Sequence, residues 1–289
     1  MKLKGWISRS FGIDIQKYMR EVWKYLVDMI NTQGFVLLGL VDPDKHSEYK
    51  GANLALSMEI GGSDAIIVGG STGAEGDVIS DTIKCIKTKV KIPVIIFPGN
   101  SGAVSRYADA IYYLSIKNTT SSYWGVEFPV LMAPLIKKAA IEPISAAYII
   151  VEPGEAAGWI CQAFPFPRQK PELAVMGALS AEYSGAKMVI IDSGSGSKLG
   201  IPIELISRVS SEIKIPLIYG GGVRTPEQAY LVIKEGASGI HVGTVAEESD
   251  NVVNTFKSLK IAMNNGYKAR KTEQLIKVKP SRDSSDISH

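Results

Sequence analysis

Three short apolar runs in the second half of the sequence end in clusters of small residues that could hold an anion. The clusters are Asp192-Ser193-Gly194-Ser195-Gly196, Gly220-Gly221-Gly222 and Gly243-Thr244. Glycine lacks a Cβ, so its backbone can approach a ligand closely and direct N–H groups at a phosphate. Apolar runs that stop at such turns are typical of buried parallel strands. The pattern predicts a phosphorylated substrate.

Asp192 is the residue that we expect to act as a general base. It directly follows the apolar run Val189-Ile190-Ile191. Its carboxylate could accept a proton from a hydroxyl that attacks carbon. A carboxylate in this position can also cap its own loop by accepting backbone N–H groups, and the sequence leaves both interpretations open.

A second acidic group follows the first apolar run, in the segment Asp42-Pro43-Asp44-Lys45. Mg²⁺ prefers one or two carboxylates together with water and phosphate oxygens, so this segment could hold Mg²⁺ and a diphosphate. The hydroxyl of Ser71, which follows the second run, could enter the same metal shell. Asp-Pro-Asp is also a common turn composition, and the glycines beside Ser71 are equally typical of a flexible turn.

Eight apolar runs at intervals typical of βα units could position these groups. They cover 35–41, 64–68, 93–97, 110–115, 147–151, 187–191, 216–219 and 238–242. Helix-like stretches lie between most of them, over 46–60, 78–88, 134–140, 171–184, 203–213 and 226–235. This alternation predicts an α/β protein with a (β/α)8 TIM barrel. The stretch 100–109 is too short for a full helix, so we expect a loop in place of one barrel helix.

We expect three parts along the chain. A helical extension occupies 1–34, with an amphipathic pattern over 14–33, and the barrel domain covers 35–266. The stretch 247–265 is expected to be the closing helix. The segment 267–289 is polar and basic, which is typical of a flexible tail. The basic stretch 257–282 could contact an anionic membrane surface, or it could simply be a solvated helix and tail.

The overall composition excludes several classes of protein. A formal net charge of +3 gives no case for nucleic acid as a partner. Two cysteines fit a reducing compartment, and no stretch approaches the ~20 apolar residues of a membrane span, so we expect a cytoplasmic protein. The three histidines form no zinc pattern with these cysteines, and the triple glycine does not match the dinucleotide fingerprint.

Several motifs stand in a specific order and spacing over 36–246. They include Leu40-Val41-Asp42-Pro43-Asp44-Lys45, Val68-Gly69-Gly70-Ser71, Phe97-Pro98-Gly99-Asn100 and Gly220-Gly221-Gly222-Val223-Arg224. In this order and spacing the sequence resembles the archaeal geranylgeranylglyceryl phosphate synthases. The resemblance is far more specific than any single loop.

The resemblance implies a reaction and its participants. Such enzymes use Mg²⁺ and join the C3 hydroxyl of sn-glycerol 1-phosphate to carbon 1 of geranylgeranyl diphosphate, with loss of diphosphate. This forms the first ether bond of archaeal membrane lipids. The family's metal positions fall on Asp42 and Ser71, and its homo-oligomers imply a dimer or larger assembly. Its glycerol phosphate positions fall on Ile190, Ile191, Asp192, Ser193, Gly194, Ser195, Gly196, Gly221, Gly222, Gly243 and Thr244.

Three positions depart from the family's usual sequence. Ile190 replaces a tyrosine, Asp192 replaces a glutamate and Thr244 replaces an asparagine. A base displaced by about 1 Å can cost roughly a hundredfold in rate. Two alternatives therefore stay open, namely a relative that uses another polyprenyl donor and a phosphate-binding barrel without turnover. An isomerase of the histidine or tryptophan pathway type has less support, because no second acid–base pair is evident.

Overall fold

Eight parallel strands form a closed barrel in the computed structural model, which describes residues 21–70 and 72–278. Neighbouring strands pair in sequence order, and β8 closes the ring against β1. The predicted (β/α)8 barrel is thereby confirmed. The strands are β1 (Val36–Val41), β2 (Ala65–Val68), β3 (Val94–Ile96), β4 (Ala110–Ile116), β5 (Glu142–Ile150), β6 (Met188–Asp192), β7 (Leu217–Gly220) and β8 (Gly239–Val242).

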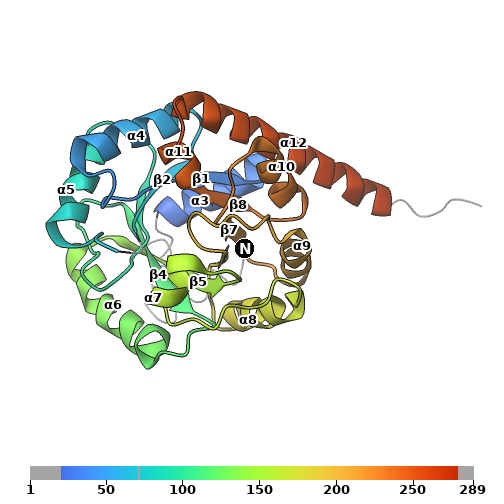
Figure 1. The fold of residues 1–289 in the computed structure, drawn as a ribbon, viewed down its shortest axis with the longest axis horizontal. Helices are drawn as coiled ribbons and strands as arrows, with labels where there is room; N and C mark the ends of the chain where they lie inside the picture. The colour runs from blue at the N-terminus through green and yellow to red at the C-terminus, as the bar shows by residue number, and fades with distance from the viewer. Residues whose placement is uncertain (1–20, 71, 279–289) are drawn as a thin grey trace, which may run out of the picture.

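Helices surround this barrel as an outer ring (Figure 1). The stretch between β3 and β4 contains no helix, so the predicted replacement of one barrel helix by a loop is also confirmed. The helices are α3 (Glu21–Gln33), α4 (Glu48–Ile60), α5 (Gly76–Lys87), η1 (Tyr123–Glu127), α6 (Phe128–Ala139), α7 (Glu155–Ile160), α8 (Pro171–Tyr183), α9 (Ile203–Glu212), α10 (Pro226–Lys234), α11 (Thr244–Glu247) and α12 (Val252–Val278).

Two elements begin earlier than the sequence predicted. Strand β5 begins at Glu142 rather than at 147, because the buried Glu142 carboxylate accepts the N–H groups of Val22 and Trp23 at the start of α3. Helix α6 begins at Phe128 rather than at 134, because Pro129 stands in its first turn, where a missing N–H costs nothing.

The closing helix α12 extends to Val278, so the predicted flexible tail from 267 begins inside a helix. The guanidinium group of Arg270 explains the extension, because it donates hydrogen bonds to the carbonyl oxygens of Ala237 and Gly34 on the barrel. The rest of the tail, and 14–20 of the predicted N-terminal helix, lie outside the described residues. Within the described part, no helix is both long enough and apolar enough to cross a membrane.

A buried ion pair joins α12 to the first two strands. Asp64, which is 5% exposed, accepts hydrogen bonds from the Lys260 ammonium (2.6 and 2.7 Å) and from the N–H of Leu37 (2.7 Å). Lys260 is on α12, so this contact fixes the closing helix against the start of β1.

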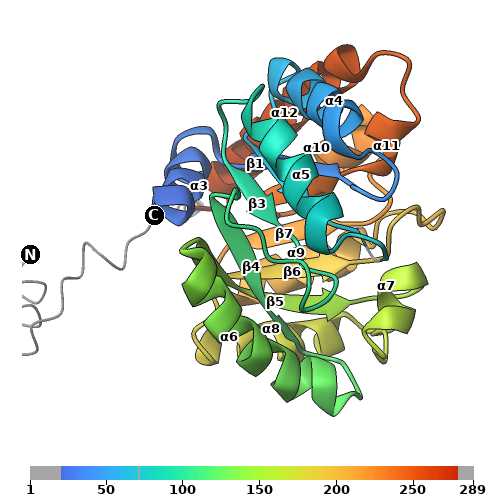
Figure 2. The same cartoon turned by 90° about the vertical axis from the view of Figure 1, so that its left-hand side faces the viewer.

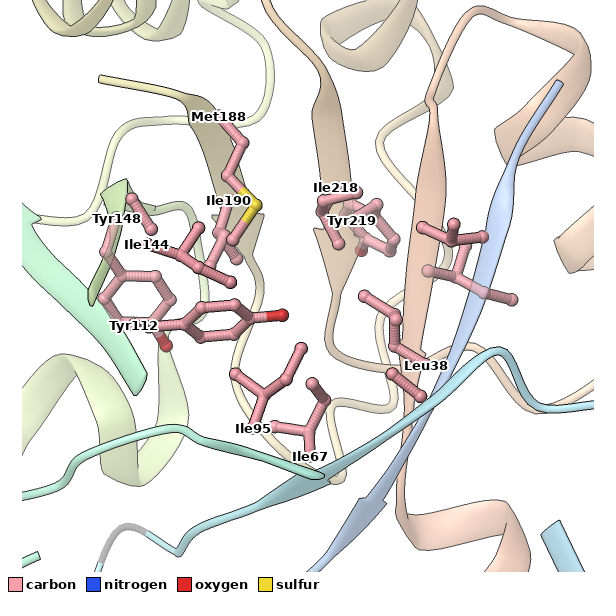
Figure 3. Close-up of a cluster of buried hydrophobic side chains, with 14 of the residues drawn as sticks. Leu38, Ile67, Ile95, Tyr112, Ile144, Tyr148, Met188, Ile190, Ile218 and Tyr219 are labelled. Atoms are coloured by element: carbon pink, nitrogen blue, oxygen red, sulfur yellow. The ribbon is translucent and has the colours of Figure 1, made fainter. Parts of the chain in front are cut away.

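All eight strands point the same way, so their carboxyl ends meet at one face of the barrel. Helix α3 closes the opposite, amino-terminal end, while α7 stands beside the carboxyl-terminal face (Figure 2). Large side chains fill the barrel interior, as Figure 3 shows for Leu38, Ile95, Tyr112, Ile190 and Ile218. A packed interior leaves the loops at the carboxyl ends as the place for a ligand.

Candidate active site

Asp192 lies at the carboxyl end of β6, where the glycine loops after β6 and β7 meet. A Cβ added to Gly221 would lie 2.7 Å from Oδ1 of Asp192 and 2.8 Å from the carbonyl oxygen of Gly194. Gly221 also has a φ of +85°, which other residues rarely adopt. The two loops therefore approach each other as only glycine permits, and three of the predicted site residues come together.

Two donors hold the Asp192 carboxylate. The N–H of Gly194 donates to Oδ1 at 2.6 Å, which is the loop-capping contact that the sequence suggested. The hydroxyl of Tyr148 donates to Oδ2 at 2.9 Å. Both carboxylate oxygens are thus fixed in direction, and the side chain cannot rotate freely.

Tyr148 is not among the residues predicted from the sequence. It lies on β5 directly opposite Ile190, the position where a tyrosine hydroxyl is absent. A tyrosine hydroxyl nevertheless reaches Asp192 from the neighbouring strand. The only signal in the sequence is one residue with a hydroxyl group near the carboxyl end of an apolar strand, which is the end of a barrel strand where active sites lie.

Burial governs the electrostatics of this pair. It raises the pKa of Asp192 above the ordinary aspartate value, while the hydrogen bonds from Gly194 and Tyr148 oppose the rise by stabilising the ionised form. Burial, together with the Asp192 charge, raises the pKa of Tyr148, so this hydroxyl keeps its proton at neutral pH. A partly buried carboxylate with a raised pKa is suited to accept a proton.

Ile190 and Ile191 contribute differently, because successive side chains of a strand point to opposite faces. Ile190 points into the barrel interior, near Tyr112 and Tyr148 (Figure 3). Ile191 therefore faces the surrounding helices, where it is fully buried, and its backbone pairs with the neighbouring strands.

Aromatic side chains support Tyr148 from inside the barrel. The ring of Phe97 packs edge-on against Tyr112 and Tyr148, with ring centroids 5.5 and 5.4 Å apart. The Tyr112 hydroxyl and Nε2 of His241 share a hydrogen bond of 3.1 Å. Burial lowers the pKa of His241 to about 3, so this histidine is neutral and belongs to the core.

The remaining predicted phosphate residues line the loops next to Asp192. The backbone of Gly222 approaches Ser197, and the buried Ser193 hydroxyl bonds to that of Tyr219 at 2.9 Å. Ser195 is exposed on the same loop and Gly196 is partly exposed. The β6 and β7 loops thus offer a glycine-rich surface with both hydroxyl and amide groups.

The loop after β8, together with α11, contacts loops on either side of it at the carboxyl-terminal face of the barrel. Gly243 packs against Leu40 of β1, and Thr244 begins α11. From α11, Glu247 binds Lys45 at 2.9 Å and the adjacent residue, Glu248, binds Arg224 at 2.5 Å. Helix α11 therefore links the loop that carries Asp42 to the loop that carries the triple glycine.

Asp42 and Asp44 turn their carboxylates toward the loop after β2. A Cβ on Gly70 would overlap the Asp42 carboxylate, and one on Gly73 would lie 2.5 Å from Oδ1 of Asp44. Burial raises the pKa of Asp42, against the opposing effects of the Asp44 N–H and the Lys45 charge. Ser71 belongs to this loop but lies outside the described residues.

This donor set fits Mg²⁺, which takes one or two carboxylates and completes its shell with water and substrate phosphates. The carboxylates of Asp42 and Asp44 pack directly against Gly70 and Gly73, where a larger side chain would displace them. Across 21–70 and 72–278, no three or more His, Cys, Asp and Glu side chains gather as a metal-binding group. Any metal at Asp42 would therefore share its shell with a substrate.

Comparison with known proteins decides the family. Residues 28–260, which include every predicted site residue, match the profile of the PcrB family. This chain belongs to the PcrB family. Among PcrB relatives, it is 44% identical to the geranylgeranylglyceryl phosphate synthase of Pyrococcus horikoshii over 246 residues, which is 85% of this chain and 96% of that protein. With the synthase of Methanosarcina acetivorans the identity is 41%, over 80% of this chain and 94% of that protein.

A solved structure supports the same assignment for this PcrB member. The (S)-3-O-geranylgeranylglyceryl phosphate synthase of Thermoplasma acidophilum, crystallised in complex with its substrate sn-glycerol-1-phosphate, matches with a TM-score of 0.79 and 36% identity. The match covers 83% of this chain and 98% of that one. The resemblance inferred from the sequence motifs is thereby confirmed.

Proposed function

We propose that this PcrB chain is a geranylgeranylglyceryl phosphate synthase, which joins the C3 hydroxyl of sn-glycerol 1-phosphate to carbon 1 of geranylgeranyl diphosphate. The observation that carries the proposal is the Asp192 carboxylate, held by Tyr148 and Gly194 where two glycine loops meet. Named synthases 41–44% identical to this chain favour this reaction over a barrel without turnover.

The glycine loops would bind the acceptor. N–H groups of the β6 and β7 loops would hold the phosphate, since Gly196 has open space beside it and both Gly196 and Gly222 are partly exposed. Asp192 would then face the C3 hydroxyl. Fixed between its two donors, its carboxylate would orient the hydroxyl and accept the proton as the ether bond forms.

The acidic region would bind the diphosphate of the donor. Asp42, together with Asp44 and the Ser71 hydroxyl that the family resemblance adds, would hold Mg²⁺, which when bound neutralises negative charge on the departing diphosphate. The bond between carbon 1 and the diphosphate oxygen breaks as the C3 oxygen bonds to carbon 1. The diphosphate leaves with the electron pair, and the packed barrel interior beneath the loops excludes water from the reacting carbon.

The test is an assay of ether formation with labelled sn-glycerol 1-phosphate, geranylgeranyl diphosphate and Mg²⁺. We expect prenylated product from sn-glycerol 1-phosphate and little from sn-glycerol 3-phosphate. Chelation of Mg²⁺, Asp42→Asn and Asp192→Asn should each remove most of the product. Donors with longer and shorter prenyl chains belong in the same assay, because the chain length of the donor is part of the proposal.

Tight binding of sn-glycerol 1-phosphate without product from any donor would contradict the proposal and favour the barrel without turnover. Preference for a donor with a longer prenyl chain would leave the proposed reaction unchanged and replace geranylgeranyl diphosphate as the donor.

A homo-oligomer, contact of the basic stretch 257–282 with an anionic membrane and a cytoplasmic location stay predictions. Light scattering of the purified protein tests the first. Vesicle binding that is weakened by salt and lost on deletion of 268–289 would support the second, whereas binding that survives the deletion would exclude the tail.

A further inference from the structure

Ser197 carries a buried hydroxyl with no assigned partner. The residue is 2% exposed, and its Oγ finds no hydrogen-bond partner in the described part of the chain. It directly follows the predicted phosphate segment, which ends at Gly196, and it was not among the predicted site residues. Native proteins leave few buried polar groups unpaired, because such a group has lost its bonds to water without replacement.

The position of Ser197 suggests what the partner is. Its N–H donates to the carbonyl oxygen of Gly194 at 3.2 Å, which closes the glycine turn after β6. Its own carbonyl oxygen and Cβ lie 3.0 and 3.6 Å from the point where a Cβ on Gly222 would stand. Ser197 is therefore a second point of contact between the turn after β6 and the turn after β7, beside that of Gly194 with Gly221.

The polar side chains near Ser197 already have hydrogen-bond partners, and one of them holds the Ser197 loop in place. The hydroxyls of Ser193 and Tyr219 bond to each other at 2.9 Å, so neither is left without a partner. Arg168 donates to the carbonyl oxygens of Gly200 and Glu152, which anchors the far end of the Ser197 loop and leaves a positive charge beside it. Among the described residues, Ser197 is the one buried hydroxyl without a partner.

We propose that the Ser197 hydroxyl donates a hydrogen bond to the phosphate of sn-glycerol 1-phosphate and is a further ligand of the acceptor substrate. The inference rests on the proposed function, which places a phosphate between these two turns. A phosphate oxygen accepts a charge-assisted hydrogen bond, which is stronger than a bond between neutral groups. Binding would thus satisfy a hydroxyl that the protein alone leaves unpaired.

Calorimetric titration of Ser197→Ala with sn-glycerol 1-phosphate tests the proposal. We expect the dissociation constant and the KM for this substrate to rise about 10- to 100-fold, as for loss of one hydrogen bond to a charged group. The kcat should change little. Inorganic phosphate should lose affinity by a similar factor, because the contact is made with the phosphate and not with the glycerol hydroxyls.

The melting temperature distinguishes a ligand-binding role of Ser197 from a structural one. The free Ser197→Ala protein should melt at the same temperature as the wild type or higher, because the substitution removes an unpaired buried hydroxyl. Ser211→Ala is the matched control, since Ser211 is exposed on α9 and bonds only within its own helix. It should change neither binding nor melting.

Three results would overturn the inference: unchanged affinity of Ser197→Ala for sn-glycerol 1-phosphate, a melting temperature several degrees lower, or weakened binding that spares inorganic phosphate. The proposed function fails separately. A wild-type protein that binds sn-glycerol 1-phosphate but forms no ether refutes the synthase and leaves the Ser197 contact standing.

Discussion

Replacing Gly221 with alanine tests whether the two glycine loops must touch. At this position the backbone φ is +85°, and the added Cβ would lie 2.7 to 2.9 Å from Oδ1 of Asp192 and from the backbone oxygen and nitrogen of Gly194. The left-handed conformation alone costs alanine about 1–2 kcal/mol. Overlap with backbone atoms adds about 1–3 kcal/mol or forces the loops apart.

Gly185→Ala provides a matched control. Gly185 has a φ of +81°, and a Cβ added there meets nothing within 4 Å. It lies just before β6, at the amino-terminal end of the barrel and away from the proposed site. The two variants therefore share the backbone cost, and only Gly221→Ala disturbs the contact with Asp192.

Urea unfolding and ether-forming activity measure the two effects. We expect both variants to lose about 1–2 kcal/mol of unfolding free energy, with a further loss for Gly221→Ala. We expect kcat/KM to fall about a hundredfold in Gly221→Ala, because a shift of about 1 Å in a catalytic group has that effect. Gly185→Ala should stay near the wild-type rate. Equal activity in the two variants would refute the claim that the loops form one site.

Three further predictions concern single side chains. Asp192→Asn should lower kcat at least about a hundredfold without lowering the unfolding free energy at pH 7. Burial raises the pKa of Asp192, so the ionised carboxylate lowers the unfolding free energy of the wild type above that pKa. As the pH falls through this pKa, the unfolding free energy of the wild type should therefore rise relative to that of Asp192→Asn. A difference in unfolding free energy that does not change with pH would contradict this prediction. Tyr148→Phe removes a hydrogen bond that lowers the pKa of Asp192, so the acid limb of the pH profile of kcat/KM should move to higher pH. An unmoved limb would exclude Tyr148 as a partner of the base. Asp64→Ala leaves the Lys260 ammonium unpaired and should cost about 3–5 kcal/mol in urea unfolding; a loss under about 1 kcal/mol would mean that the pair is dispensable.

The barrel could be predicted from sequence because its signals are local. Each strand is a short apolar run, and several helices are amphipathic, as α5 and α9 are, or capped, as α10 is. Their alternation is therefore visible without knowledge of contacts. The start of β5 could not be found in this way. In the sequence, the charged residue Glu142 indicates a position outside the strand. Only the hydrogen bonds that its carboxylate accepts from Val22 and Trp23 on α3 allow it to be part of a buried strand.

Some site residues could likewise be predicted from the sequence, and others could not. Asp42, Asp192 and the triple glycine follow strand ends, so their shared face of the barrel could be predicted. Tyr148 acts through its position opposite Ile190 in the strand pairing, and register between strands is not encoded in either strand alone. Ser197 stands out because its hydroxyl is buried and unpaired, and both facts exist only in the folded chain.

A crystal structure of this protein with sn-glycerol 1-phosphate is the most direct test of the central claim. We predict that the phosphate lies between the loops that carry Gly194 and Gly221, with the C3 hydroxyl within hydrogen-bonding distance of the Asp192 carboxylate. A phosphate bound elsewhere, or a C3 hydroxyl directed away from Asp192, would contradict the account.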